Sequence, residues 1–302
     1  MQRRGSTKQQ ASTASELTLA NILVVLTWTQ QAYDRCTELR HQYGHHCAVD
    51  SRHQQQDDGK HYFSAFWLAM GFYRVGAIVN AISQGLDTVF LDSDTVVLGD
   101  FLLLIQSLDG ADVVTTTERC VVRNYSRPYD RNELTAWTAN IGLTYFRAVP
   151  GTLRCGTSWM ARMFHDVVIS GRTWDQVAFN VVFPDCYRHF GLVWYGLDPR
   201  VFQLSCGQAG FKQCGCTFDD ADVQAYESGG EAVRPERMSQ KFVPFSSPGV
   251  CGPADWRLWH TKHYNCIIGV NGSSPQVVKA EYMRNLIKAA HSNTTGVIMP
   301  SR

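Results

Sequence analysis

The sequence predicts an α/β protein in which helices flank a mostly parallel central sheet. The main observation is that short apolar runs rich in β-branched residues alternate with longer amphipathic segments along the first third of the chain. A length of 302 residues is enough to bury a substantial core. The composition, with 44% hydrophobic and 18% charged residues, is typical of a globular protein and excludes a disordered or fibrous one.

Hydrophobic periodicity places the individual elements. Helices are predicted over residues 30–42, 62–83, 155–169 and 276–291, with another that opens at residue 173. Strands are predicted over residues 21–27, 46–49, 112–117, 139–146, 192–194 and 201–204, with two strand segments within residues 89–97. Gly85 is expected to end the second helix in a left-handed conformation. Residues 1–19 are expected to form a disordered tail or a targeting stub, and residues 293–302 a C-terminal tail.

Charge and hydropathy argue against a nucleic-acid partner and against a membrane-spanning segment. The chain has 28 Lys and Arg against 27 Asp and Glu, so no net field favours nucleic acid. No run of about 20 apolar residues occurs, so no transmembrane span is expected in the chain as given.

Ten cysteines are scattered along the chain without a C-x-x-C pair. Cys206, Cys214, Cys216 and Cys251 form a candidate zinc cluster, but their spacing differs from that of most zinc sites. Disulfides are the favoured interpretation, and free buried cysteines remain an alternative. Sequons at Asn124, Asn271 and Asn293 also agree with a protein of the secretory pathway.

The strongest candidate for a functional site is the acidic pair Asp92 and Asp94, which lies between two apolar strand segments. Two carboxylates this close repel each other, and a divalent cation between them relieves the repulsion. The pattern therefore predicts a metal site at the end of a strand. One alternative is an idle, solvated acidic turn. Another is a D-x-D-x-T phosphotransfer site, which position 96, a valine, disfavours.

Three further motifs are candidates for the same site. The stretch from Thr173 to Gln176 reads as a capping box, with Trp174, Val177, Ala178 and Val181 on the buried face of the helix. Alternatively, Asp175 and Gln176 point into a crevice. Gly142, two residues after Asn140, marks either a bulge or a ligand close to the backbone. His260 and His263 are either structural or a third ligand beside the aspartates, which suits Mn²⁺.

Taken in order, these motifs resemble the nucleotide-diphospho-sugar transferase family of plants and algae, which includes rhamnogalacturonan xylosyltransferases and extensin arabinosyltransferases of cell-wall glycoproteins. The match spans residues 22 to 287. The resemblance implies a GT-A fold in a single domain over residues 20–292. It further implies a nucleotide-binding half at about 20–110, an acceptor half at about 111–292, and a location in the Golgi lumen or the secretory pathway.

Residue roles follow from the resemblance alone. Asp92 and Asp94 become the DXD motif, which with intervening Ser93 holds Mn²⁺ (or Mg²⁺) on the donor diphosphate. The metal gains His263, or in reserve His260, as a further ligand. Lys279 meets the diphosphate, and Asp175 and Gln176 are the catalytic pair. The donor sugar is lined by Asn140, Gly142, Asp175 and Gln176, and the nucleotide end by Thr27, Thr29 and Arg74.

The expected function is a metal-dependent, retaining transfer of a sugar from a UDP-sugar donor to a glycan or glycoprotein acceptor. Xylose, arabinose, galactose and glucose all remain possible donor sugars. Two alternatives stay open. One is an inactive sugar- or partner-binding protein on a transferase fold, and the other is a metal-dependent phosphatase or nucleotidyltransferase.

Overall fold

The computed structural model describes residues 22–49, 65–117, 122–130, 133, 139–204, 220–228, 259–264 and 275–294. The chain divides into two compact units, Met1–Tyr62 and Phe63–Arg302. The predicted boundary between the nucleotide-binding half and the acceptor half, near residue 110, does not coincide with this structural boundary. The division into these two halves remains a prediction. The candidate zinc cysteines lie outside the described residues. Within the described residues, no helix is both long and apolar enough to cross a membrane.

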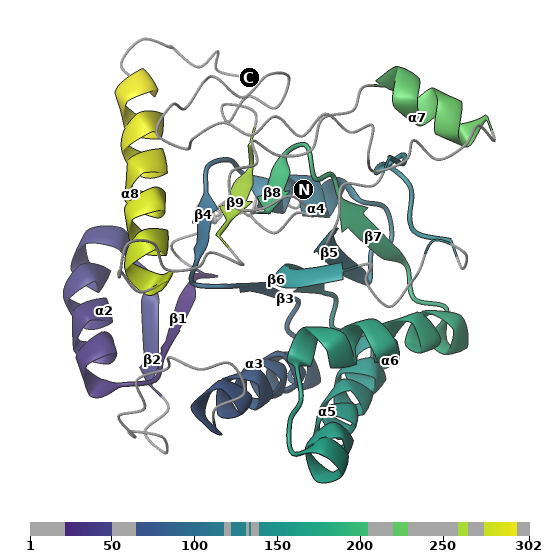
Figure 1. Cartoon of the computed structure of the whole chain (residues 1–302), viewed down its shortest axis with the longest axis horizontal. Helices are drawn as coiled ribbons and strands as arrows, with labels where there is room; N and C mark the ends of the chain where they lie inside the picture. The colour runs from purple at the N-terminus through teal and green to yellow at the C-terminus, as the bar shows by residue number, and fades with distance from the viewer. Residues whose placement is uncertain are drawn as a thin grey trace, which may run out of the picture. The chain divides into compact units, whose positions relative to one another are not determined.

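The described part of the first unit is a single β-α-β motif (Figure 1). Strand β1 (Val24–Thr27) pairs in parallel with β2 (His46–Val49), and helix α2 (Gln30–Tyr43) connects them. Helix α2 begins where the Thr29 side chain accepts a hydrogen bond from the Ala32 amide, and it ends at Gly44, whose φ is 75°.

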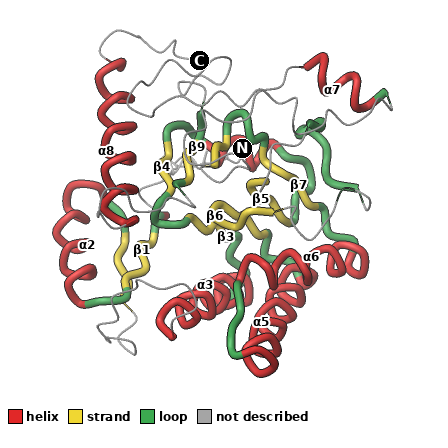
Figure 2. The backbone as a smooth tube through the Cα atoms, in the orientation of Figure 1, coloured by secondary structure: helices red, strands yellow, loops and turns green. Residues whose placement is uncertain are grey.

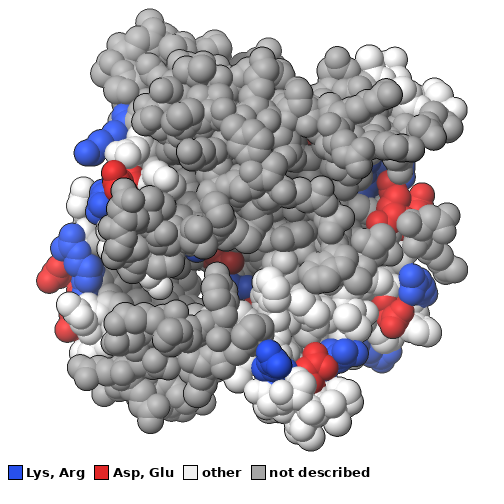
Figure 3. Space-filling model, viewed as in Figure 1, with Lys and Arg blue, Asp and Glu red and all other residues white. Residues whose placement is uncertain are grey.

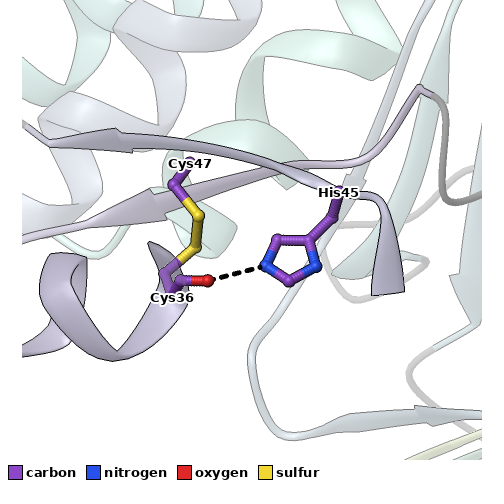
Figure 4. Close-up of side chains that lie close together, drawn as sticks. All are labelled: Cys36, His45 and Cys47. Atoms are coloured by element: carbon purple, nitrogen blue, oxygen red, sulfur yellow. Dashed lines mark hydrogen bonds between the residues drawn. A yellow bond between two sulfur atoms is a disulfide. The ribbon is translucent and has the colours of Figure 1, made fainter. Parts of the chain in front are cut away.

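A disulfide between Cys36 and Cys47 links α2 to β2 (Figure 4). His45 lies beside it, and its Nε2 is 3.2 Å from the carbonyl oxygen of Cys36. A second disulfide joins Cys155 to Cys186 in the other unit. All four described cysteines are therefore oxidised, which agrees with the prediction of disulfides.

The second unit contains two small sheets. The first has the strand order β3 (Thr88–Leu91), β6 (Ala139–Phe146), β5 (Val113–Thr117) and β7 (Trp194–Leu197). The second has the order β4 (Thr95–Val97), β9 (Thr261–His263) and β8 (Phe202–Leu204). The helices are α3 (Ala65–Ser83), α4 (Phe101–Ser107), α5 (Pro150–Ser170), α6 (Asp175–Phe190), α7 (Asp220–Glu227) and α8 (Pro275–Thr294).

The expectation of a mostly parallel central sheet is wrong for the four-stranded sheet. Strand β6 is antiparallel to both β3 and β5, and only β5 and β7 are parallel. The regular alternation of strand and helix holds only as far as β3. After a short turn β3 is followed by β4, which belongs to the three-stranded sheet, while β3 itself pairs with β6.

The core lies between the four-stranded sheet and helices α3, α5 and α6, which pack together in Figure 1. Five aromatic rings form its centre, and each is at most 1% exposed: Phe146, Trp159, Phe179, Phe183 and Trp194. A smaller apolar cluster that includes Val96, Tyr264 and Leu286 joins α8 to β4. These two clusters fix α3, β6, α6, β9 and α8, the elements that carry the candidate site.

Local differences from the predicted elements have identifiable causes. Helix α5 begins at Pro150, five residues before the predicted start, because proline is favoured in the first turn of a helix. Gly85 has a φ of 79°, as predicted. The capping box at Thr173 does not form: Trp174 is the N-cap of α6, and it makes no side-chain capping bond. Helix α4, capped by Asp100, was not predicted.

Candidate active site

The acidic pair lies in the turn between β3 and β4, and its backbone is held from two sides. The amide of Asp92 donates to the carbonyl of Gly142 in β6 at 2.8 Å, and the carbonyl of Asp94 accepts from the amide of Tyr264 at 2.9 Å. The turn itself is closed by a bond from the Thr95 amide to the Asp92 carbonyl. Ser93, at the tip of this turn, is exposed. The two carboxylates are therefore fixed relative to both sheets.

His263 brings an imidazole to this pair. Its Nε2 lies 3.0 Å from a carboxylate oxygen of Asp94 and 3.5 Å from one of Asp92. Strand β9 lies beside β4 (Figure 2) and runs antiparallel to it with His263 opposite Thr95. This pairing places the His263 ring at the acidic turn. The three residues offer ligand atoms that all lie within 4.8 Å of one another. Strand pairing thus unites residues that are far apart in the sequence.

Asn140 and Gly142 fix the orientation of the His263 ring. The Asn140 side-chain oxygen accepts a hydrogen bond from the Gly142 amide at 2.9 Å, and it lies 3.2 Å from Nδ1 of His263. An oxygen there requires the proton on Nδ1, so the lone pair of a neutral ring is on Nε2 and faces the carboxylates. A Cβ atom at position 142 would overlap with the ring, so only glycine leaves room for it.

His260, the reserve candidate, is not a member of this group. Its ring stacks on Phe202 with centroids 5.4 Å apart, and its Nδ1 lies against Gly99. His263 is therefore the histidine that the structure brings to the aspartates.

Arg74 connects the acidic turn to the start of α6. Its guanidinium forms ion pairs with Asp92 and, at 2.9 Å, with Asp175. It also lies over the ring of Phe90, 4.6 Å from the centroid. The prediction placed Arg74 at the nucleotide end of the donor, whereas the structure places it between two predicted functional carboxylates. A single arginine on a helix gave no sequence signal for this bridging position.

Asp175 and Gln176 begin helix α6, and both are buried, with exposed fractions of 7% and 8%. Asp175 also accepts a bond through its backbone carbonyl from the Trp159 indole at 2.8 Å. The Gln176 side-chain oxygen accepts a bond from the Ile141 amide at 3.3 Å, which fastens α6 to β6. Asn180, which the sequence did not single out as functional, reinforces this link by bonding both the amide and the carbonyl of Ala139.

Lys279 projects from the first turns of α8 and forms an ion pair with the Asp94 carboxylate. The predicted nucleotide residues Thr27 and Thr29 belong to the first unit. There the Thr27 hydroxyl donates to the Ala48 carbonyl at 3.0 Å, and the Thr29 hydroxyl caps α2. Both hydroxyls thus have a structural use, and their role toward a nucleotide stays a prediction.

The two aspartates differ in their electrostatics. Burial raises the pKa of Asp92 above its ordinary value, and Arg74 and His263 offset this only in part. Burial would also raise the pKa of Asp94, but hydrogen bonding and charge from His263 and Lys279 outweigh it and lower that pKa. Asp94 is therefore the carboxylate whose charged form is favoured, whereas burial disfavours the charged form of Asp92.

On the face in Figure 3, the basic and acidic side chains of the described residues lie interspersed. A cluster of two carboxylates, one imidazole, an arginine and a lysine offers ligand atoms for a cation and positive charge for a phosphorylated ligand.

Comparison with known families agrees with this chemistry. A model of nucleotide-diphospho-sugar transferases matches residues 18–226, which include the acidic turn, Asn140, Gly142 and the start of α6. His263 and Lys279 lie beyond the matched residues. No curated protein matches the chain. Because the match covers more than half of its length, the chain belongs to the nucleotide-diphospho-sugar transferase family.

Proposed function

We propose that the protein is a divalent-metal-dependent glycosyltransferase that moves a sugar from a UDP-sugar to a glycan or glycoprotein acceptor with retention at the anomeric carbon. Family membership supports the transfer of a sugar from a nucleotide-sugar donor. The observation that carries the metal dependence is the meeting of Asp92, Asp94 and His263 at one point.

The residues at this point fit a cation. The Asn140 oxygen sets the proton of His263 on Nδ1, so the Nε2 lone pair of a neutral ring faces two carboxylates at 3.0 and 3.5 Å. Arg74 and Lys279 already balance part of the carboxylate charge, and a cation bound to Nε2 and both carboxylates would balance more of it. One imidazole and two carboxylates suit Mn²⁺, with Mg²⁺ as the alternative. Such a cation would act as a Lewis acid toward the charge that develops on the departing diphosphate.

The chain's own cations extend this charge stabilisation. Lys279 pairs with Asp94 and is assigned to the donor diphosphate, and Arg74 pairs with Asp92 and Asp175. Preorganised cations of this kind stabilise a leaving group without reorganisation at the moment of reaction. Arg74 also keeps the Asp175 carboxylate at a fixed distance from the acidic turn.

Retention is proposed to follow a same-face route. The bond between the anomeric carbon and the phosphate oxygen breaks, and its electron pair leaves with the diphosphate. The acceptor oxygen bonds to the anomeric carbon from the same side and passes its proton to the departing phosphate. The transition state resembles an oxocarbenium ion, and the Asp175 carboxylate stabilises it electrostatically.

A secretory location, in the Golgi lumen, is part of the proposal. Its support is that all four described cysteines form disulfides, which persist in oxidising compartments. The sequon at Asn124 is consistent with this, and its side chain is partly exposed.

The test is a panel of UDP-sugars, including UDP-xylose, UDP-arabinose, UDP-galactose and UDP-glucose, assayed for UDP release with and without Mn²⁺. We expect Mn²⁺-dependent release with one donor, and a loss of about 100-fold or more in Asp94→Ala. Asp185→Ala, an exposed carboxylate paired with Arg188 on α6, is the control and should keep full activity.

Three outcomes would contradict the proposal. Equal UDP release by wild type and Asp94→Ala would remove the acidic pair from the mechanism. Normal folding without turnover of any donor would favour a binding protein on a transferase fold. Cleavage between phosphates, detected as UMP or inorganic phosphate without sugar transfer, would favour a phosphatase or nucleotidyltransferase. Proton NMR of the product then shows whether the anomeric configuration is retained.

A further inference from the structure

Two tryptophans lie beside each other next to the acidic site. Trp67 comes from the first turn of α3 and Trp174 is the N-cap of α6, and their rings meet edge to face with centroids 6.5 Å apart. Trp174 is 41% exposed, although Thr173 and Asp175 on either side are only 5% and 7% exposed. The sequence pattern predicted Trp174 on the buried face of α6, so its outward position is a finding that core packing does not explain.

One face of α3 joins this aromatic pair to the acidic site. Trp67, Gly71 and Arg74 follow one another at helical spacing, so they lie on the same side of the helix. A Cβ atom at Gly71 would lie 3.6 Å from the Cβ of Asp175, which shows how closely α3 passes the start of α6. Arg74, one turn further on, pairs with Asp175 and Asp92. Ion pairs thus lead from Asp92 through Arg74 to Asp175, the residue that follows Trp174 in the chain.

The backbone beneath the indole is held in place. The carbonyl of Asp175 accepts from the buried Trp159 indole at 2.8 Å, and its carboxylate is held by Arg74 and by the Gln176 amide, the latter at 2.8 Å. The aromatic pair is therefore preorganised, which lowers the entropic cost of binding a ligand.

We propose that Trp67 and Trp174 form an acceptor subsite in which a sugar ring of the acceptor stacks on the exposed indole of Trp174. A sugar ring carries a face of C–H groups, which complements the electron-rich face of an aromatic ring, while its hydroxyl edge stays free for polar contacts. Trp174 directly precedes Asp175, which Arg74 connects to Asp92. The inference rests on the proposed transferase function, and it deepens that function by naming a carbohydrate as the group recognised on the acceptor.

The test is saturation-transfer difference NMR with methyl glycosides of xylose, arabinose, galactose and glucose in both anomeric forms, without donor or metal. We expect at least one glycoside to receive saturation on the C–H protons of one ring face. Trp174→Ala and Trp67→Ala should weaken its binding about three- to tenfold, and Trp174→Phe should weaken it less. Thermal unfolding checks that each variant is folded.

Phe190→Ala is the matched control, because Phe190 is also 41% exposed and lies at the opposite end of the same helix. It should leave glycoside binding unchanged. The subsite would be overturned by equal binding in wild type and Trp174→Ala, or by a panel in which no glycoside binds. A failure of the transferase proposal looks different: UDP release is then absent although glycosides still bind at Trp174. Normal UDP release without glycoside binding would remove the subsite alone.

Discussion

Gly142→Ala is the substitution that most sharply separates the geometry of the site from its charge. It removes no ligand and changes no ionisable group. Gly142 does not have a left-handed backbone, so alanine can adopt its conformation. The added methyl group would nevertheless lie 2.9 Å from Nε2 of His263, and closer still to Nδ1 and Cε1. The imidazole must move by roughly 1.5 Å to reach ordinary contact distance.

Two magnitudes follow from this displacement. The shift breaks the 3.2 Å contact between Nδ1 and the Asn140 oxygen, which orients the ring toward Asp92 and Asp94. Losing an orienting partner of a metal ligand costs about 10- to 100-fold in metal affinity. Overpacking of a buried position typically costs about 1–3 kcal/mol in the free energy of unfolding. Metal affinity should therefore fall markedly while the protein still folds.

The assay is titration of Mn²⁺ by isothermal calorimetry, with circular dichroism and thermal unfolding as checks on the fold. Gly76→Ala is the control, since a methyl group there would meet only Met160, at an ordinary 3.6 Å. It lies inside α3, where alanine is more stable than glycine by about 0.5–1 kcal/mol. A folded Gly142→Ala protein that binds Mn²⁺ as tightly as wild type would refute the placement of His263 in the metal site.

Three further predictions concern single contacts. Lys279→Met should raise the KM for the nucleotide sugar about 10-fold or more in steady-state kinetics, because a charged hydrogen bond to the diphosphate is lost. The affinity for Mn²⁺ should not fall, since the lysine no longer competes with the metal for Asp94. Burial lowers the pKa of Lys262 from 10.5 to about 7. Between these two pH values the unfolded chain binds more protons than the folded one, so the free energy of unfolding should rise with pH. Lys262→Met should reduce this dependence by up to about 1.4 kcal/mol per pH unit, as measured by urea unfolding. Replacing both Cys155 and Cys186 by alanine should lower the free energy of unfolding by about 3–4 kcal/mol in the same assay, the value expected for a disulfide that closes a loop of 31 residues. An unchanged free energy of unfolding would show that this disulfide is absent.

The sequence predicted the elements well where a local signal defined them. Strands 46–49 and 139–146 were placed at their observed bounds. Gly85 marked the end of α3 correctly, since a left-handed cap favours glycine. Sheet direction could not be read in the same way: strand pairing depends on contacts between distant segments, and β6 proved antiparallel to both neighbours.

The candidate site, too, was predicted where a local sequence signal exists and missed where only long-range contacts define it. Asp92 and Asp94 stood out because two carboxylates between apolar runs are unusual, and the family resemblance supplied His263 as a partner. The structure brings these residues together through the pairing of β4 with β9, which no local pattern predicts. The bridging position of Arg74 and the outward turn of Trp174 were missed, because helical periodicity says which residues share a face but not what that face meets.

The central claim is that one divalent cation binds between the acidic turn and His263. Anomalous diffraction from crystals grown with Mn²⁺ and UDP tests it most directly. We predict a single strong anomalous peak within about 2.0–2.3 Å of oxygens of Asp92 and Asp94 and of Nε2 of His263. A peak at His260 instead, or no peak within reach of the two aspartates at saturating Mn²⁺, would contradict it.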